Sequence, residues 1–114
     1  MKRITRDELC ALLDGGAVTL VEALSELAYI TEHLPGAVNV PGALTAELAA
    51  QVAPDPARTV VVYCSGPACG RSKVTAAGFE RLGYTDVRVY PGGKSDWAEA
   101  GLPFTGSRTE AAAA

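Results

Sequence analysis

The sequence contains no apolar run that approaches the roughly 20 residues needed to cross a bilayer. Residues 1–7 pass directly into charged positions and lack the apolar core of a secretory signal peptide. The formal net charge is −3 and the basic residues are scattered, so no basic patch is present for nucleic acid or anionic lipid. We therefore expect a cytoplasmic domain that binds neither membranes nor nucleic acid.

Metal ligands and disulfide partners are also scarce. The chain has one histidine, His33, and three cysteines at positions 10, 64 and 69. An odd number of cysteines at this spacing does not fit the disulfide framework of a small secreted domain. A tetrahedral zinc site needs four ligands, and only Cys64 and Cys69 lie close together in the sequence. We expect no metal, no cofactor and at least one free thiol.

The 114 residues have the length and composition of one folded domain, with 48% hydrophobic and 20% charged residues. We expect this domain over residues 1–105 and a flexible tail over 106–114, which has no apolar pattern. Strand-like segments alternate with helix-like ones, which predicts an α/β domain with a parallel central sheet. The expected strands are 18–21, 37–40, 59–63 and 86–90, and the expected helices are 6–14, 26–30, 43–52, 72–82 and 95–100.

Two of these elements carry strong local signals. Thr5 to Glu8 has the form of a capping box, in which each end residue satisfies a free backbone donor at a helix start. Residues 59–63 begin with four consecutive β-branched residues and are apolar on both faces, as a central parallel strand requires. Cys64 therefore follows the central strand, at the edge of the sheet where ligands bind in such folds.

The loop after Cys64 has the composition of an anion site. Its N–H groups have no partner in the sheet and can converge on one point, where the next helix start and an inward-folded Arg71 would add positive charge. Gly66 and Gly70 permit the positive φ values that turn successive N–H groups to one side. We expect the anion to be bound by Ser65, Gly66, Pro67, Ala68, Gly70, Arg71 and Ser72.

A thiol beside such a loop has a lowered pKa and becomes a nucleophile without a histidine base. The alternative is that Cys64 is the last core residue of a strand and Cys69 fills a turn, since buried free cysteine is common. Gly, Pro and Arg-Ser between a strand and a helix make little core and cost conformational entropy. A loop that holds an anion explains them better.

Several separate segments, in the right order, resemble the single-domain rhodanese (sulfurtransferase) family over residues 4–104. They are TVVVYC with the following Arg71-Ser72, then AAGFERLGY and DVRVYPGGKSDWAEAGLP, and upstream EHLPGAVNVP. The resemblance implies a three-layer α/β/α domain with a five-stranded, mainly parallel sheet and a catalytic cysteine at Cys64. It implies a thiolate that takes sulfane sulfur from thiosulfate or a persulfide, holds it as Cys–S–S⁻ among the loop amides, and passes it to a thiol or cyanide.

The partners implied are a small-molecule sulfur donor and acceptor, with a protein acceptor as a further alternative, and the oligomeric state is left as monomer or homodimer. The chain departs from the family pattern in its loop, because six residues separate Cys64 from Arg71 instead of four. It also has Glu22 without the arginine that usually follows, and a second loop cysteine. Because Arg71 is only two residues beyond Cys69, we expect Cys64 to be the nucleophile.

Cys69 is left with two roles. It resolves a Cys64 persulfide or an oxidised Cys64 as a disulfide, or it is a neutral loop thiol or a donor to the bound anion. A second hypothesis for the whole domain is accordingly a non-catalytic, redox-sensing module that uses the Cys64/Cys69 pair. A phosphatase or arsenate reductase fits less well, because the loop length does not match and the loop holds no general-acid aspartate.

Other residues are expected to have structural roles. Cys10 and Trp97 should pack in the core, and His33 should be hydrogen-bonded in a turn. Glu22 either contacts the loop from a neighbouring strand end or holds backbone, and Lys94 lies near the rim of the pocket. None of these is expected to be catalytic.

Overall fold

The computed structural model describes residues 1–109 of the chain. Its centre is a five-stranded sheet with the strand order β1-β5-β4-β2-β3, in which every pair of neighbours is parallel. The strands are β1 (Lys2–Arg3), β2 (Val18–Glu22), β3 (Val38–Asn39), β4 (Thr59–Tyr63) and β5 (Val87–Tyr90). The helices are α1 (Arg6–Gly15), α2 (Glu26–Thr31), α3 (Ala46–Val52), α4 (Arg71–Arg81) and α5 (Gly93–Glu99). The predicted α/β fold with a five-stranded parallel sheet is confirmed.

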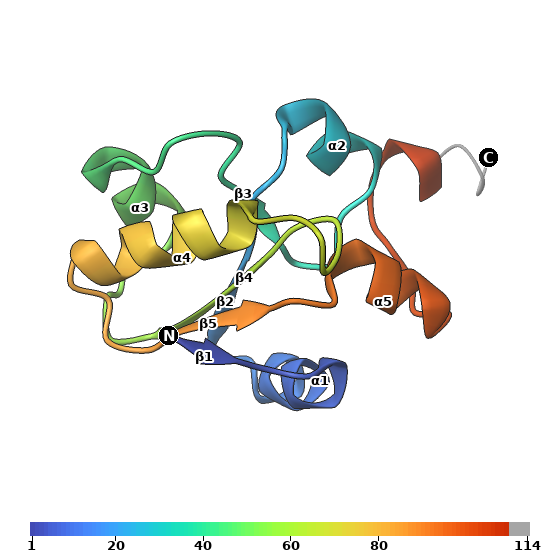
Figure 1. Cartoon of the computed structure of the whole chain (residues 1–114), viewed down its shortest axis with the longest axis horizontal. Helices are drawn as coiled ribbons and strands as arrows, with labels where there is room; N and C mark the ends of the chain where they lie inside the picture. The colour runs from blue at the N-terminus through green and yellow to red at the C-terminus, as the bar shows by residue number, and fades with distance from the viewer. Residues whose placement is uncertain (110–114) are drawn as a thin grey trace.

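The sheet separates two apolar clusters. Side chains alternate along a strand, so Val60 and Val62 of β4 face α3 and α4, whereas Val61 and Tyr63 face α1 and α5. Figure 1 shows α3 and α4 on one side of the sheet and α1 and α5 on the other. This is the three-layer arrangement that the resemblance implied, with β4 in the middle as predicted.

Local signals account for most element boundaries. The capping box of α1 is present, because Thr5 Oγ1 accepts the Glu8 N–H at 3.2 Å and Glu8 Oε1 accepts the Thr5 N–H at 3.0 Å. The predicted start of α3 at residue 43 is wrong by three positions. The helix begins after Thr45, whose hydroxyl caps it by accepting the Leu48 N–H at 3.1 Å.

The sequence analysis missed β1. Its two residues pair with the edge of β5, with Lys2 opposite Arg88 and Arg3 opposite Val89. Two exposed basic residues carry no alternating apolar pattern, so only the neighbouring strand defines them as a strand.

The first residues of the expected tail are attached to the domain. Gly106 is buried, and the preceding Thr105 exchanges backbone hydrogen bonds of 2.8 and 2.9 Å with His33. Residues 107–109 are helical, and Arg108 forms a 3.0 Å ion pair with Glu32 beside α2. The sequence analysis placed these residues in a flexible tail because it had no signal for the pairing with His33. The remainder of that tail, 110–114, lies outside the described residues.

Candidate active site

The loop between β4 and α4 is held against the first turn of α5. The carbonyl oxygens of Cys64 and Ser65 accept the backbone N–H groups of Lys94 at 3.1 Å and of Ser95 at 2.9 Å. The loop then reverses through a β-turn over Pro67 and the exposed Ala68, closed by a 3.0 Å bond from the Cys69 N–H to the carbonyl of residue 66. The loop therefore takes its shape from its own turn and from a helix about 30 residues further along the chain.

The glycine that this arrangement requires is Gly93. It has φ +59°, and a Cβ atom there would lie 2.4 Å from the Cys64 carbonyl oxygen and 2.8 Å from the Gly66 nitrogen. The predicted positive φ values at Gly66 and Gly70 are wrong, because neither glycine is in the left-handed region. The β-turn and the contacts with α5 orient the loop amides instead, and the residue with a left-handed backbone conformation is Gly93, at the start of α5.

Cys64 occupies the end of β4, as predicted, but it is only 2% exposed. Its sulfur lies 3.4 Å from the Cys69 carbonyl oxygen and 3.3 Å from the buried Ser72 Oγ. Burial is the main reason that the pKa of this thiol is raised, and the Cys69 side chain raises it further. The predicted lowering of the Cys64 pKa is therefore wrong, since the loop covers the strand end and excludes water from the sulfur.

Cys69 is only partly buried, and its pKa is shifted in the opposite direction from that of Cys64. Burial opposes ionisation of this thiol, but hydrogen bonds from the Cys64 thiol, from the backbone N–H groups of Arg71 and Ser65, and from the Ser65 hydroxyl together lower its pKa. The sequence analysis expected Arg71 to lie too near in sequence to cradle this sulfur, and the Arg71 contribution to the Cys69 pKa comes from its backbone N–H.

The guanidinium of Arg71 does not fold inward over the loop. Its Nη2 donates to the Pro41 carbonyl oxygen at 2.8 Å, and the residue is exposed. Arg71 and Gly70 line a cleft of about 550 Å³ together with Val40 and Gly42. The positive charge therefore lies at the mouth of a mainly apolar cleft beside the loop, and not on a sulfur.

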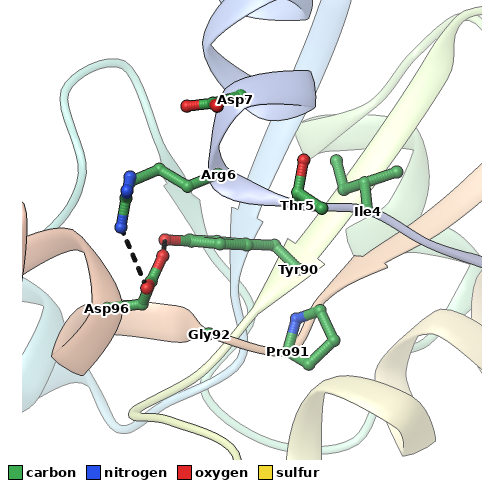
Figure 2. Close-up of a pocket in the computed structure, with 8 residues that line it drawn as sticks. All are labelled: Ile4, Thr5, Arg6, Asp7, Tyr90, Pro91, Gly92 and Asp96. Atoms are coloured by element: carbon green, nitrogen blue, oxygen red, sulfur yellow. Dashed lines mark hydrogen bonds and ion pairs between the residues drawn. The ribbon is translucent and has the colours of Figure 1, made fainter.

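A second cleft, of about 340 Å³, lies between the start of α1 and the turn from β5 to α5. Figure 2 shows Arg6 and the Tyr90 hydroxyl both directed at the Asp96 carboxylate. Arg6 Nη1 is 3.0 Å from Asp96 Oδ1. These polar groups pair with one another and neither loop thiol lines the cleft, so we place the candidate active site at the loop after β4.

A buried carboxylate lies behind the loop. Glu22 ends β2 and is fully buried, with Oε1 accepting the Tyr63 hydroxyl at 2.7 Å and Oε2 lying 3.0 Å from Lys94 Nζ. Burial and the Glu22 carboxylate raise the pKa of the Tyr63 hydroxyl far above its ordinary value. The sequence analysis singled out Glu22 and Lys94 separately, and the structure brings them together.

The remaining residues have structural contacts. His33 Nδ1 is 2.7 Å from the Tyr29 carbonyl oxygen, and the two rings stack with centroids 4.0 Å apart. Trp97 is buried and donates from Nε1 to the Pro103 carbonyl at 2.9 Å, as expected of a packing anchor. Cys10 packs partly buried in the cluster under α1. Within residues 1–109, no three His, Cys, Asp or Glu side chains gather as metal ligands would, and no helix is long and apolar enough to span a membrane.

The fold and the site together define a parallel α/β domain with a two-cysteine loop at the carboxyl end of its central strand. The family model for the rhodanese-like domain matches residues 5–100. The chain belongs to the rhodanese-like domain family, as the sequence resemblance indicated.

Comparison with individual proteins gives relatives of two kinds. An HTH-type transcriptional regulator, Rv0324 of Mycobacterium tuberculosis, is 36% identical over 100 residues, which cover 88% of this chain and 43% of the regulator. The chain thus spans less than half the length of that relative. A rhodanese with anions from E. coli is 30% identical, with a TM-score of 0.65 over 80% of this chain and 100% of the other. A thiosulfate sulfurtransferase from Pseudomonas aeruginosa is 29% identical, with a TM-score of 0.73 over 93% of this chain and 20% of the other.

Proposed function

We propose that this domain moves sulfane sulfur from thiosulfate or a persulfide donor to a thiophilic acceptor through a cysteine persulfide in the loop after β4. The observation that carries the proposal is the pair of thiols in the loop at the end of β4, where the Cys64 Sγ lies 3.4 Å from the Cys69 carbonyl oxygen and Cys69 is partly exposed, with a pKa that donors from Cys64, Arg71 and Ser65 lower. Such donors stabilise a thiolate before attack and a persulfide anion after it. The similarity to a rhodanese and to a thiosulfate sulfurtransferase supports the same reaction class.

The donor arrangement favours Cys69 as the attacking sulfur, whereas the sequence analysis favoured Cys64. With thiosulfate, the Cys69 thiolate attacks the sulfane sulfur, a new S–S bond forms, and sulfite leaves with the electron pair of the broken S–S bond. The terminal sulfur of the resulting Cys69–S–S⁻ carries the negative charge, which neighbouring loop N–H groups offset. A thiolate or cyanide then attacks that terminal sulfur and restores the Cys69 thiolate.

Cys64 takes the second role in this proposal. Its Sγ lies 3.4 Å from the Cys69 carbonyl oxygen and 3.3 Å from Ser72 Oγ, and its side chain is one of the groups that lower the pKa of Cys69. If it attacks the inner sulfur of the Cys69 persulfide, it forms the Cys64–Cys69 disulfide and releases hydrosulfide, with its own proton passing to the leaving sulfur. This internal reaction competes with transfer to an external acceptor.

The test is persulfide mapping in three proteins. The reduced wild-type chain is incubated with thiosulfate, and we expect a mass increase of one sulfur atom that maps to Cys69 and disappears on addition of cyanide. The Cys69→Ser variant should gain no sulfur, and Cys64→Ala should gain it more slowly. An adduct on Cys64 that persists in Cys69→Ser would refute the assignment to Cys69, and no adduct in any of the three proteins would refute sulfur transfer.

A second candidate function is a redox- or persulfide-sensing module. It is favoured by the hydrogen-bonded thiol pair and by the 36% identity to a transcriptional regulator. In that case a polysulfide or hydrogen peroxide should convert the pair to an internal disulfide in one turnover, without thiocyanate formation from cyanide. Steady thiocyanate production by the same sample would exclude this alternative as the main function.

The partners that we propose follow from the chemistry. They are a small-molecule sulfur donor and a thiol or cyanide acceptor, with a protein thiol as a further acceptor, in a cytoplasmic setting. The monomer and the homodimer are both compatible with this proposal, because all of the donors around Cys69 come from a single chain.

A further inference from the structure

We propose that the cleft of about 550 Å³ beside the loop binds the sulfur acceptor, and that this acceptor is an organic thiol with an aliphatic body and a carboxylate. The inference rests on the proposed function, because it names the substrate class for the second half of the same reaction. Its elements are the apolar lining of the cleft, the charge at its mouth and its position next to the two thiols.

The lining of the cleft is mainly apolar. Ala23 directly follows β2, Val40 directly follows β3, and Val74 lies in the first turn of α4. Ala23 and Val40 are buried, whereas Val74 is 70% exposed, so the apolar lining extends from the core to the surface. A cleft of this volume has the size of pockets that bind small organic ligands. Thiosulfate and cyanide have no apolar body to bury there, so the cleft fits an organic reactant better.

The charge at the mouth of the cleft favours an acidic ligand. Among the described residues that line the cleft, Arg71 alone carries a charge. Its Nη2 donates to the Pro41 carbonyl oxygen at 2.8 Å, which holds the guanidinium against the segment that leads to Gly42. No carboxylate within residues 1–109 forms an ion pair with Arg71. A guanidinium has further N–H donors and matches a carboxylate in shape and charge, so the carboxylate of a ligand fits at this position.

The cleft adjoins the loop that carries the thiols. Gly70 lines the cleft and directly follows Cys69, which is partly exposed. A thiol whose body lies in the cleft is therefore held beside the loop persulfide, and this raises its effective concentration there. The acceptor thiolate attacks the terminal sulfur and forms a new S–S bond. The old S–S bond breaks with its electron pair returning to the cysteine, and the product is the persulfide of the acceptor.

The test compares three thiols as acceptors, with thiosulfate as the donor and steady-state sulfite release as the measure of turnover. Mercaptohexanoate has both the aliphatic body and the carboxylate, mercaptohexanol lacks the charge, and mercaptoacetate lacks the long body. We expect kcat/KM for mercaptohexanoate to exceed each of the other two by about tenfold, an effect typical of gaining or losing a contact in an apolar pocket. Equal values for the three thiols would overturn the proposal.

Two variants test whether this preference arises in the cleft. A Cβ atom at Gly42 would meet nothing within 4 Å, and the φ of Gly42 is not positive, so Gly42→Leu adds a side chain to the lining without backbone strain. It should lower kcat/KM for mercaptohexanoate by about tenfold. Arg71→Met should reduce that value to the level of mercaptohexanol. Gly15→Leu is the matched control, because Gly15 has the same open space at the end of α1, across the sheet from α4, and the preference should stay as in the wild type (Figure 1). A full preference in Gly42→Leu would overturn the proposal.

Binding is also measured without sulfur chemistry, so that the two proposals fail separately. Hexanoate, which has no thiol, should shift the backbone amide resonances of Gly42 and Val74, and it should bind more weakly to Arg71→Met. Hexanoate binding by a protein that takes up no sulfur from thiosulfate would refute the proposed function and leave the cleft as a site for an organic acid. Sulfur transfer without hexanoate binding, and without a preference among the thiols, would refute this inference and leave the proposed function standing.

Discussion

Replacement of Gly93 by alanine should destabilise the contact between α5 and the loop that carries both thiols. Gly93 has φ +59°, a conformation that costs an L-residue about 1–2 kcal/mol. The added Cβ would also lie 2.4 Å from the Cys64 carbonyl oxygen and 2.8 Å from the Gly66 nitrogen. Because both atoms are backbone, no side-chain rotation can relieve the clash, and the loop must move away from α5.

The movement should weaken the two hydrogen bonds that join the loop to α5, from the N–H groups of Lys94 and Ser95. At about 0.5–1.5 kcal/mol for each bond, added to the conformational cost, the expected loss of unfolding free energy is about 2–5 kcal/mol. The alkylation of Cys69 by iodoacetamide, measured against pH by peptide mass, should slow as well, since the Ser65 N–H is held by the same contact.

A second glycine with positive φ, Gly101, serves as a control that separates the steric clash at Gly93 from the cost of the left-handed backbone conformation. Gly101 has φ +72°, and a Cβ atom there would meet nothing within 4 Å, so Gly101→Ala should cost only about 1–2 kcal/mol. Both variants are unfolded in urea and followed by the fluorescence of Trp97, the only tryptophan in the chain. Equal losses in the two variants, with unchanged Cys69 alkylation in both, would refute the reasoning about the loop.

Three further predictions concern the thiols and the supports of the fold. Cys64→Ala removes a hydrogen bond to the Cys69 sulfur, so the pKa of Cys69 should rise and its alkylation curve should move to higher pH; a curve that stays in place would contradict this coupling. Tyr63→Phe removes the hydroxyl that donates to Glu22 and should cost about 1–3 kcal/mol in urea unfolding, whereas a neutral effect would mean that the buried carboxylate finds another donor. Thr5→Ala should cost about 1 kcal/mol through the lost helix cap, and a change in Cys69 alkylation would count against treating α1 as independent of the loop.

Much of the fold could be predicted because its signals are local. The capping box at Thr5 begins α1, and the run of β-branched residues from Thr59 is the central strand. The two-residue strand β1 had no such signal, since its pairing is defined by β5. The attachment of Gly106 depends likewise on a contact with a distant part of the chain, beside His33.

The candidate site likewise has features that local sequence signals predict and features that depend on tertiary contacts. The cysteine at the end of the central strand, the anion-type loop composition and the helix start at Arg71 could all be identified from residues 59–72. The sequence alone could not show which of the two thiols is the more reactive, because distance along the chain does not tell how deeply each sulfur is buried in the folded loop. The folded loop buries Cys64, which raises the pKa of that thiol, and leaves Cys69 partly exposed with a lowered pKa.

The sequence by itself determined the parallel α/β class, the family and the segment that carries the two thiols, because periodicity, caps and turn residues act over a few neighbouring positions. Only the tertiary structure decided that Cys64 is buried while Cys69 stays partly exposed. That difference depends on how the loop closes against α5, through hydrogen bonds from the N–H groups of Lys94 and Ser95, which lie about 30 residues further along the chain.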